Sequence, residues 1–334
     1  MIGRRRARST RSTLHDTTDR TVAADVALGM TVRIGSVSLP NPVMTASGTS
    51  GHGAELAPYI DLGALGAVVV KSLAAFAWAG NPSPRLHPTP AGMLNAVGLQ
   101  GPGVAAWLRD DLPPLVRTGA RVVASIWGRT VAEYRAAAEL LARAPAEVVA
   151  VEVNLSCPNL EDRRHMFSHS ADATRAAVEA TVGCRRPRWA KLGATTHELP
   201  AIALAARDGG AEAVTLVNTL LGLVLDPRTG RAVLGNGGGG LSGPAIRPVA
   251  VRAVFDVAAA APDLPIVGVG GVANGEHAAE LLLAGASAVQ VGTATFADPR
   301  APARVLADLE RWAAGRGLRD VGDAVGAAHR GGLG

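Results

Sequence analysis

Lysine is almost absent from this chain. Of its 33 lysine and arginine residues, Lys71 and Lys191 are the two lysines, and the rest are arginine. A base composition that favours Ala, Gly and Arg codons explains the scarcity. It does not explain why both lysines directly follow short apolar runs, VVVK and RWAK. An ammonium is compact and its pKa shifts readily, whereas a guanidinium stays charged. The placement therefore predicts a site role for each lysine.

Long apolar runs, aromatic residues and cysteines are also scarce. No uninterrupted apolar segment approaches the roughly 18 residues that span a bilayer, and the Arg-rich start is not followed by the apolar stretch of a secretory signal. Two cysteines, Cys157 and Cys184, are too few for a disulfide framework. The histidines do not stand at metal-ligand spacing. We expect a soluble cytoplasmic protein without a metal site.

The basic charge is concentrated at the N-terminus. Residues 1–20 hold six arginines and two aspartates, a net +4 out of the formal +5 of the chain. The remaining body is close to neutral, so a general nucleic-acid surface is not indicated. We expect a disordered basic tail over 1–24 and one domain over 25–334.

Eight short apolar runs alternate with segments of helical pattern. They are VMTAS, AVVVK, VVASIWG, VVAVEVN, RWAKLG, AVTLVN, PIVGVGG and AVQVGTA. Helices are expected between them, for example over 131–143 and 276–284. Continuous apolar strands are typical of parallel sheets buried on both faces. The pattern predicts a (β/α)8 TIM barrel, with a doubly wound open sheet as the alternative. The connection after Asn218, which contains DPRTG and GNGGGG, is long, and long connections of this kind are often functional. A small hairpin with a flexible tip is the alternative for its glycine run, Gly235 to Gly240.

The ends of these runs are polar or glycine. In (β/α)8 barrels the chemistry lies at the carboxyl ends of the strands, so these positions are candidates for a site. They are Ser47, Lys71, Ser125, Asn154, Lys191, Asn218, Gly270 and Gly292.

Asparagine and glycine indicate what such a site would bind. Four of the eight asparagines stand before Pro or Gly and are explained by turns; the others are Asn95, Asn154, Asn159 and Asn218. These four predict a hydrogen-bonding grid for a flat polar ligand. Glycines after the seventh and eighth runs predict a phosphate held by backbone N–H groups. Cys184 fits a small core residue, whereas Cys157, in the polar segment NLSCPN, fits a proton-transfer or nucleophilic role.

These motifs resemble the dihydroorotate dehydrogenase family. NPVMTASGT, GMLNAVGLQ, NLSCPN, NTLLG and GLSGPAI carry the resemblance, which covers about residues 30–310 and is nearest the catalytic subunit of class 1B, within the soluble class 1 group. It implies an FMN-bearing barrel that oxidises dihydroorotate to orotate in pyrimidine biosynthesis.

The resemblance also implies roles for individual residues. Cys157 would remove the C5 proton while hydride passes from C6 to flavin N5, and Lys71 would contact both flavin and substrate. Lys191 would lie beside the N1 and O2 edge of the flavin. The positions that match substrate contacts are Lys71, Asn95, Asn154, Asn159, Asn218 and Thr219. Those that match flavin contacts are Ala46, Ser47, Lys71, Ser72, Ser125, Asn154, Lys191, Val217, Gly243, Gly270, Gly271, Gly292 and Thr293, the last four at the phosphate.

Some positions depart from the family pattern. Ser125 replaces a usual asparagine, Trp127 is bulky for its place, Arg163 and Arg164 align with a usual Gly-Gly pair, and AAFAWA lacks the usual Thr and Arg. These departures leave open a diverged flavin enzyme acting on another cyclic amide or enoate. An RNA-modifying barrel similar to tRNA-dihydrouridine synthase, or a flavin-free phosphate-binding barrel, are further alternatives.

Partners follow from the same resemblance. Class 1B implies a homodimer and a second subunit that carries FAD and an iron-sulfur cluster and passes electrons to NAD. We expect neither a membrane nor a nucleic-acid partner.

Overall fold

Eight parallel strands form a closed barrel in the computed structural model, which describes residues 28–156 and 166–333. The strands are β3 (Val43–Thr45), β4 (Val68–Val69), β7 (Val122–Ile126), β8 (Val148–Asn154), β9 (Arg188–Leu192), β10 (Ala213–Leu216), β15 (Ile266–Val269) and β16 (Ala288–Val291). Their order is β3-β16-β15-β10-β9-β8-β7-β4, and a parallel bridge between Met44 and Ala67 joins the two ends. The predicted (β/α)8 barrel is confirmed, and the open-sheet alternative is wrong.

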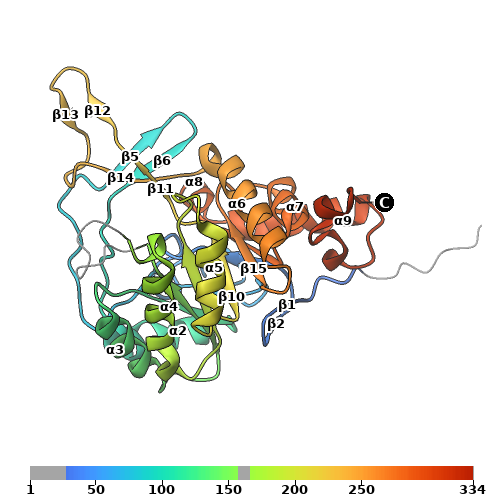
Figure 1. Cartoon of the computed structure of the whole chain (residues 1–334), viewed down its shortest axis with the longest axis horizontal. Helices are drawn as coiled ribbons and strands as arrows, with labels where there is room; N and C mark the ends of the chain where they lie inside the picture. The colour runs from blue at the N-terminus through green and yellow to red at the C-terminus, as the bar shows by residue number, and fades with distance from the viewer. Residues whose placement is uncertain (1–27, 157–165, 334) are drawn as a thin grey trace, which may run out of the picture.

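Helices surround the barrel (Figure 1). In α3 (Val131–Leu141), Tyr134, Ala137, Ala138 and Leu141 are buried, a spacing of three or four residues that gives one apolar face. The Thr130 side chain caps this helix by accepting from the Glu133 N–H. The other α-helices are α1 (Val104–Asp110), α2 (Leu112–Val116), α4 (Ala171–Ala180), α5 (Leu199–Asp208), α6 (Arg247–Ala260), α7 (Gly275–Ala284), α8 (Ala294–Ala297) and α9 (Ala301–Gly315). Short 3₁₀ turns are η1 (Phe167–His169), η2 (Thr181–Cys184), η3 (Pro244–Ile246), η4 (Val321–Ala324) and η5 (Ala327–Arg330).

A second, four-stranded antiparallel sheet is built from two insertions. β5 (Leu86–Thr89) and β6 (Gly92–Asn95) follow β4, while β11 (Leu220–Gly222) and β14 (Gly239–Ser242) follow β10, and the order is β11-β14-β6-β5. Because both insertions follow the carboxyl ends of barrel strands, the sheet stands at that end of the barrel. A hairpin of β12 (Leu225–Asp226) and β13 (Arg231–Ala232) turns at DPRTG and projects away from the barrel in Figure 1. The glycine run 235–240, where the small hairpin was expected, has a single antiparallel bridge between Leu234 and Gly237 and leads into β14.

The remaining strands form a small hairpin, β1 (Val32–Ile34) and β2 (Val37–Leu39), before the first barrel strand. Val32, Ile34, Val37 and Leu39 are buried, so this hairpin packs on the core. Within 28–156 and 166–333, no helix combines the length and apolar character that a membrane span requires.

Candidate active site

A cavity of about 1000 Å³ opens at the carboxyl ends of the barrel strands. That volume is at the upper end of the range of small-molecule and cofactor sites. The predicted site residues that line it are Ala46, Ser47, Lys71, Ser72, Asn95, Asn154, Lys191, Val217, Asn218, Thr219, Gly243, Gly270, Gly271, Gly292 and Thr293. Cys157 and Asn159, with Arg163 and Arg164, lie outside the described residues; Ser156 also lines the cavity.

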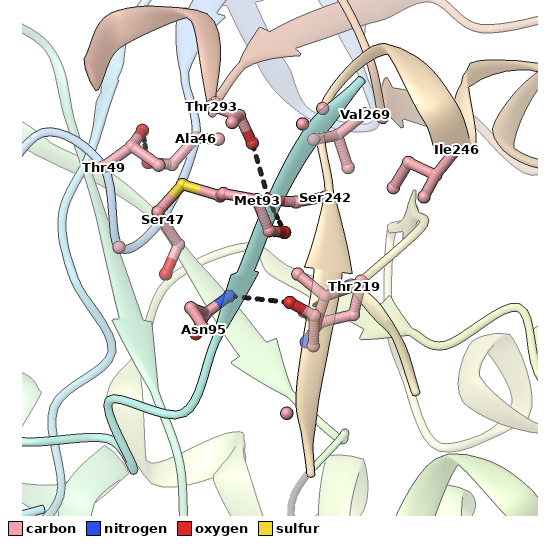
Figure 2. A pocket seen from close by; sticks show the side chains of 18 of the residues that line it. Ala46, Ser47, Thr49, Met93, Asn95, Thr219, Ser242, Ile246, Val269 and Thr293 are labelled. Carbon is pink, nitrogen blue, oxygen red and sulfur yellow. Dashed lines mark hydrogen bonds between the residues drawn. The ribbon is translucent and has the colours of Figure 1, made fainter. Parts of the chain in front are cut away.

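Segments distant in the sequence supply the wall, as Figure 2 shows. Ser47 follows β3, Asn95 ends β6 and Thr219 lies just before β11. The Asn95 amide donates to the Gly240 carbonyl across the β6–β14 pair (3.2 Å). Thr293 donates to the Ser242 hydroxyl (2.8 Å), which ties the loop after β16 to β14. The second sheet and the barrel therefore form one wall.

The predicted asparagine grid is partly present as a hydrogen-bonded row. The Thr219 N–H donates to Asn218 Oδ1 (2.8 Å), and Asn218 Nδ2 donates to Asn154 Oδ1 (3.0 Å). Asn154 Nδ2 donates to Ser72 Oγ (3.2 Å). Amides that are fixed in this way present defined donors and acceptors to a ligand.

Ser125 occupies a different place from the other predicted residues. It is fully buried and does not line the cavity. Its hydroxyl is 2.9 Å from Ser72 Oγ, which in turn is 3.1 Å from Ser47 Oγ. Serine is shorter than the asparagine expected from the family pattern, so at this position it reaches the cavity wall through Ser72.

Lys71 lines the cavity and lies within electrostatic reach of Arg85. Burial lowers its pKa, and the positive charge of Arg85 lowers it further. The backbone N–H of Lys71 donates to the Gly51 carbonyl (2.9 Å), which anchors the residue after β4. Burial, followed by the charge of Lys71, also lowers the pKa of His52. The lowered pKa of His52 favours a neutral imidazole, which avoids a second positive charge near Lys71.

Lys191 is paired with a carboxylate that the sequence analysis did not identify. Its Nζ lies 3.5 Å from Glu152 Oε1 and 3.5 Å from Gln290 Oε1. Glu152 and Gln290 are both fully buried. A signal was present in the sequence, because each is a polar residue inside an apolar strand, VVAVEVN and AVQV. Glu152 stands two residues before Asn154, on the same side of its strand.

The far end of the cavity is a glycine cradle that has no room for side chains. Gly243 (φ +96°), Gly270 (φ +140°) and Gly271 (φ +72°) hold backbone conformations that favour glycine. A Cβ on Gly243 would lie 2.7 Å from Gly92 Cα, and one on Gly271 would lie 2.6 Å from Arg247 Cβ. Glycine-rich loops of this kind suit an anion, because no side chain keeps it from the backbone N–H groups.

The bulky residues that depart from the family pattern gather in one cluster. The rings of Phe76, Trp78 and Trp127 meet edge to face at 6.0 to 6.3 Å, and the Arg129 guanidinium lies over Phe76 at 4.7 Å. Trp78 Nε1 donates to the Gly98 carbonyl (3.0 Å), and Gly98 lines the cavity. The cluster thus supports the loop after β6.

The described residues hold no group of three or more His, Cys, Asp and Glu side chains that could bind a metal ion. Cys184 is buried and unpaired with another cysteine, as expected for a core residue, and burial raises its pKa.

Comparisons with known proteins agree on one family. The family model described as dihydroorotate dehydrogenase matches residues 29–312. The chain is 49% identical over 300 residues to dihydroorotate dehydrogenase B (NAD(+)), catalytic subunit, of Desulforudis audaxviator, a match over 90% of this chain and 97% of that protein. It is 44% identical to the protein of the same name from Alkaliphilus oremlandii (89% and 98%), and 43% identical to that from Geobacter sulfurreducens (89% and 97%).

Proposed function

The chain belongs to the dihydroorotate dehydrogenase family of oxidoreductases acting on CH–CH groups, and on that premise we propose that it oxidises dihydroorotate to orotate with FMN. The observation that carries the proposal is one cavity with three neighbouring parts. Two lysine amines, a row of amides and a glycine cradle all line it. A flat polar ring, an adjacent cyclic amide and a phosphate would use these three parts together.

The residues of the cavity fit FMN. Gly270, Gly271, Gly292 and Thr293 line the cavity and would hold the phosphate through backbone N–H groups that no bulky side chain covers. Ala46, Ser47, Ser72, Val217 and Gly243 would pack around the ring and ribityl chain, with Ser125 acting through Ser72. Lys191 would stabilise negative charge at the ring edge. When bound, FMN would supply the hydride acceptor for C6 of the substrate.

The row of asparagine amides and Lys71 would orient the substrate. Asn95, Asn154, Asn159, Asn218 and Thr219 would hold the amide and carboxylate edges of dihydroorotate. Lys71 would contact flavin and substrate together, and a negatively charged ligand beside it would offset the cost of burying its ammonium. Fixed geometry of this kind lowers the barrier by positioning the reacting groups.

Cys157 would act as the base. The C5–H bond would break as its proton passes to the Cys157 thiolate. The C6–H bond would break as its hydride passes to the acceptor that FMN supplies, and the electron pair left at C5 would form the C5=C6 double bond of orotate. Cys157 directly follows Ser156, which lines the cavity. A thiol has an ordinary pKa of about 8.5, which suits proton transfer near neutrality.

A second subunit would complete the electron path. The relatives are named as catalytic subunits of an NAD(+)-linked enzyme, so a companion with FAD and an iron-sulfur cluster is the proposed electron acceptor for a homodimer of this chain. The chain's two cysteines cannot themselves supply the four thiolates of such a cluster. We place the complex in the cytoplasm, in the pathway of pyrimidine biosynthesis.

The aromatic cluster favours one alternative, a related flavin enzyme for another cyclic amide or enoate. Phe76 and Trp127 support the loop after β6 with bulky side chains where the family pattern differs. Turnover with an artificial electron acceptor separates the two. We expect dihydroorotate to exceed other cyclic amides and enoates at least a hundredfold in kcat/KM. Preference for another compound would replace the proposed substrate, and a colourless protein that takes up no FMN would exclude both flavin readings.

A further inference from the structure

A buried ion pair lies directly behind the cavity wall. Glu152 has no exposed surface and Lys191 is 5% exposed. Lys191 lines the cavity, whereas Glu152 does not. Burying two charges carries a large desolvation cost, and such a pair persists where further hydrogen bonds satisfy both groups.

Those hydrogen bonds come from neighbouring strands. Gln290 Nε2, on β16, donates to Glu152 Oε2 (2.8 Å), and Ser125 Oγ, on β7, donates to Glu152 Oε1 (3.4 Å). Gln290 Oε1 also accepts from Lys191 Nζ (3.5 Å). Strands β7, β8, β9 and β16 therefore hold the carboxylate and the ammonium in place without any ligand.

The Glu152 carboxylate also fixes which groups donate and which accept in the row of hydrogen bonds that leads through Ser125 and Ser72 to the cavity. A carboxylate accepts only, so the Ser125 hydroxyl proton is used toward Glu152 and Ser125 must accept from Ser72. The Ser72 oxygen then accepts from Asn154 Nδ2 and from Ser47. Glu152 is the fixed acceptor at the end of this chain, although it contacts no ligand.

We propose that Glu152 is a positioning residue whose carboxylate holds the Lys191 ammonium at the cavity wall and offsets its charge, so that the pair sets the reduction potential of bound FMN. The inference rests on the proposed function, because FMN is the ligand whose charge changes there. Reduced flavin carries more negative charge than oxidised flavin. A cation at the wall favours the reduced form, and a carboxylate behind that cation weakens the effect.

Glu152→Gln tests the proposal, because it removes the negative charge and keeps the size of the side chain and an acceptor for Lys191. We expect a more positive FMN midpoint potential, with the equilibrium between reduced and oxidised flavin shifted about tenfold, or about 30 mV for a two-electron couple. Gln290→Met is the matched control. It removes hydrogen bonds to the pair and leaves its charges, and it should shift the equilibrium less than about threefold, roughly 15 mV.

The outcomes are separable. A parent-like or more negative potential in Glu152→Gln overturns the inference, as does an equal shift in Gln290→Met, which would assign the effect to packing. The potential is that of FMN bound to the protein, measured without dihydroorotate. A parent protein that binds no FMN would therefore contradict the proposed function, whereas FMN bound at parent-like potential in Glu152→Gln contradicts this inference only.

A second pair of variants covers the case in which Glu152→Gln does not fold. Lys191→Met leaves the Glu152 carboxylate buried without its cation, and adding Glu152→Gln to Lys191→Met removes both charges. The double variant should unfold at a higher temperature and hold FMN at a more positive potential than Lys191→Met. Equal values for the two would overturn the proposal.

Discussion

Lys71 lies after a two-residue strand, at a position where an arginine would carry the same charge. Its ammonium lines the cavity, and burial lowers its pKa. A guanidinium is larger and planar and cannot occupy the same space with the same donor geometry.

Lys71→Arg should therefore weaken FMN binding about tenfold, or about 1.4 kcal/mol, and should raise KM for dihydroorotate. Fluorescence titration with FMN and steady-state kinetics measure the two effects. The reverse exchange Arg252→Lys, on the exposed surface of α6, serves as the control and should change neither. Parent-like behaviour of Lys71→Arg would mean that codon usage alone explains the rarity of lysine.

His52 provides a prediction about pH. Its pKa in the folded chain lies below the ordinary 6.5, because of burial and the charge of Lys71. Between the two values the unfolded chain binds more protons than the folded chain, so the free energy of unfolding decreases as the pH falls below about 6.5. His52→Gln should reduce the fall of the melting temperature between about pH 7 and pH 5. Melting curves that keep the parent's slope would contradict this.

Single residues were predictable where they directly follow an apolar run of the sequence and harder to predict where they interrupt one. Lys71, Asn154, Lys191 and Asn218 stand at run ends, and the structure brings all four to the cavity. Glu152 and Gln290 interrupt apolar strands and partner Lys191 from within the barrel. Glu152, Lys191 and Gln290 lie on different strands, which come together only when the barrel forms. Spacing along the chain therefore does not show that they are partners.

At the scale of elements, the loop between β14 and α6 has little freedom. Gly243 there has φ +96°, and the backbone of Gly92 in β6 lies where its Cβ would be. Gly243→Ala should destabilise the protein by about 2 kcal/mol through backbone strain, and should weaken FMN binding because β6 and the loop must separate.

Thermal denaturation and FMN titration measure the effects of Gly243→Ala. Gly315→Ala, at the end of α9, is the matched control, since a Cβ there meets nothing within 4 Å. That control should be neutral or slightly stabilising. If the two alanines behaved alike, the close approach of Gly243 to Gly92 would have no energetic consequence.

Apolar strands were the predictable elements. All eight runs became barrel strands, although the run AVVVK keeps two residues in β4. The strands β5 and β6 were not predicted, since they are partly exposed and β5 contains Pro88. The pairing of β6 with β14 joins segments far apart along the chain, and the Asn95–Gly240 hydrogen bond spans 145 residues. Local pattern cannot specify such pairing.

At the scale of the whole molecule, barrel closure followed from the number of strands and the crossover helices. The expected tail over 1–24 lies outside the described residues, and so does Cys157. Because residues 1–20 carry most of the net charge, removal of 1–24 should leave FMN content and kcat unchanged and should move the isoelectric point toward neutrality. Loss of FMN from the shortened chain would contradict this and would show that residues 1–24 contribute to the FMN-binding domain.

The proposed homodimer is a property of the assembly. Sedimentation equilibrium should give a mass twice the 33.9 kDa of the chain. A monomer at micromolar concentration would contradict this part of the proposal and would leave the cavity assignment intact.

The central claim is that this cavity holds FMN and lets Cys157 take a proton from dihydroorotate. Anaerobic rapid mixing of the yellow protein with dihydroorotate, followed by the loss of flavin absorbance, tests it most directly. We predict rapid bleaching in the parent and bleaching at least a thousandfold slower in Cys157→Ala, with FMN content unchanged. Equal bleaching rates in the two proteins, or no bleaching of the FMN-loaded parent, would contradict the account.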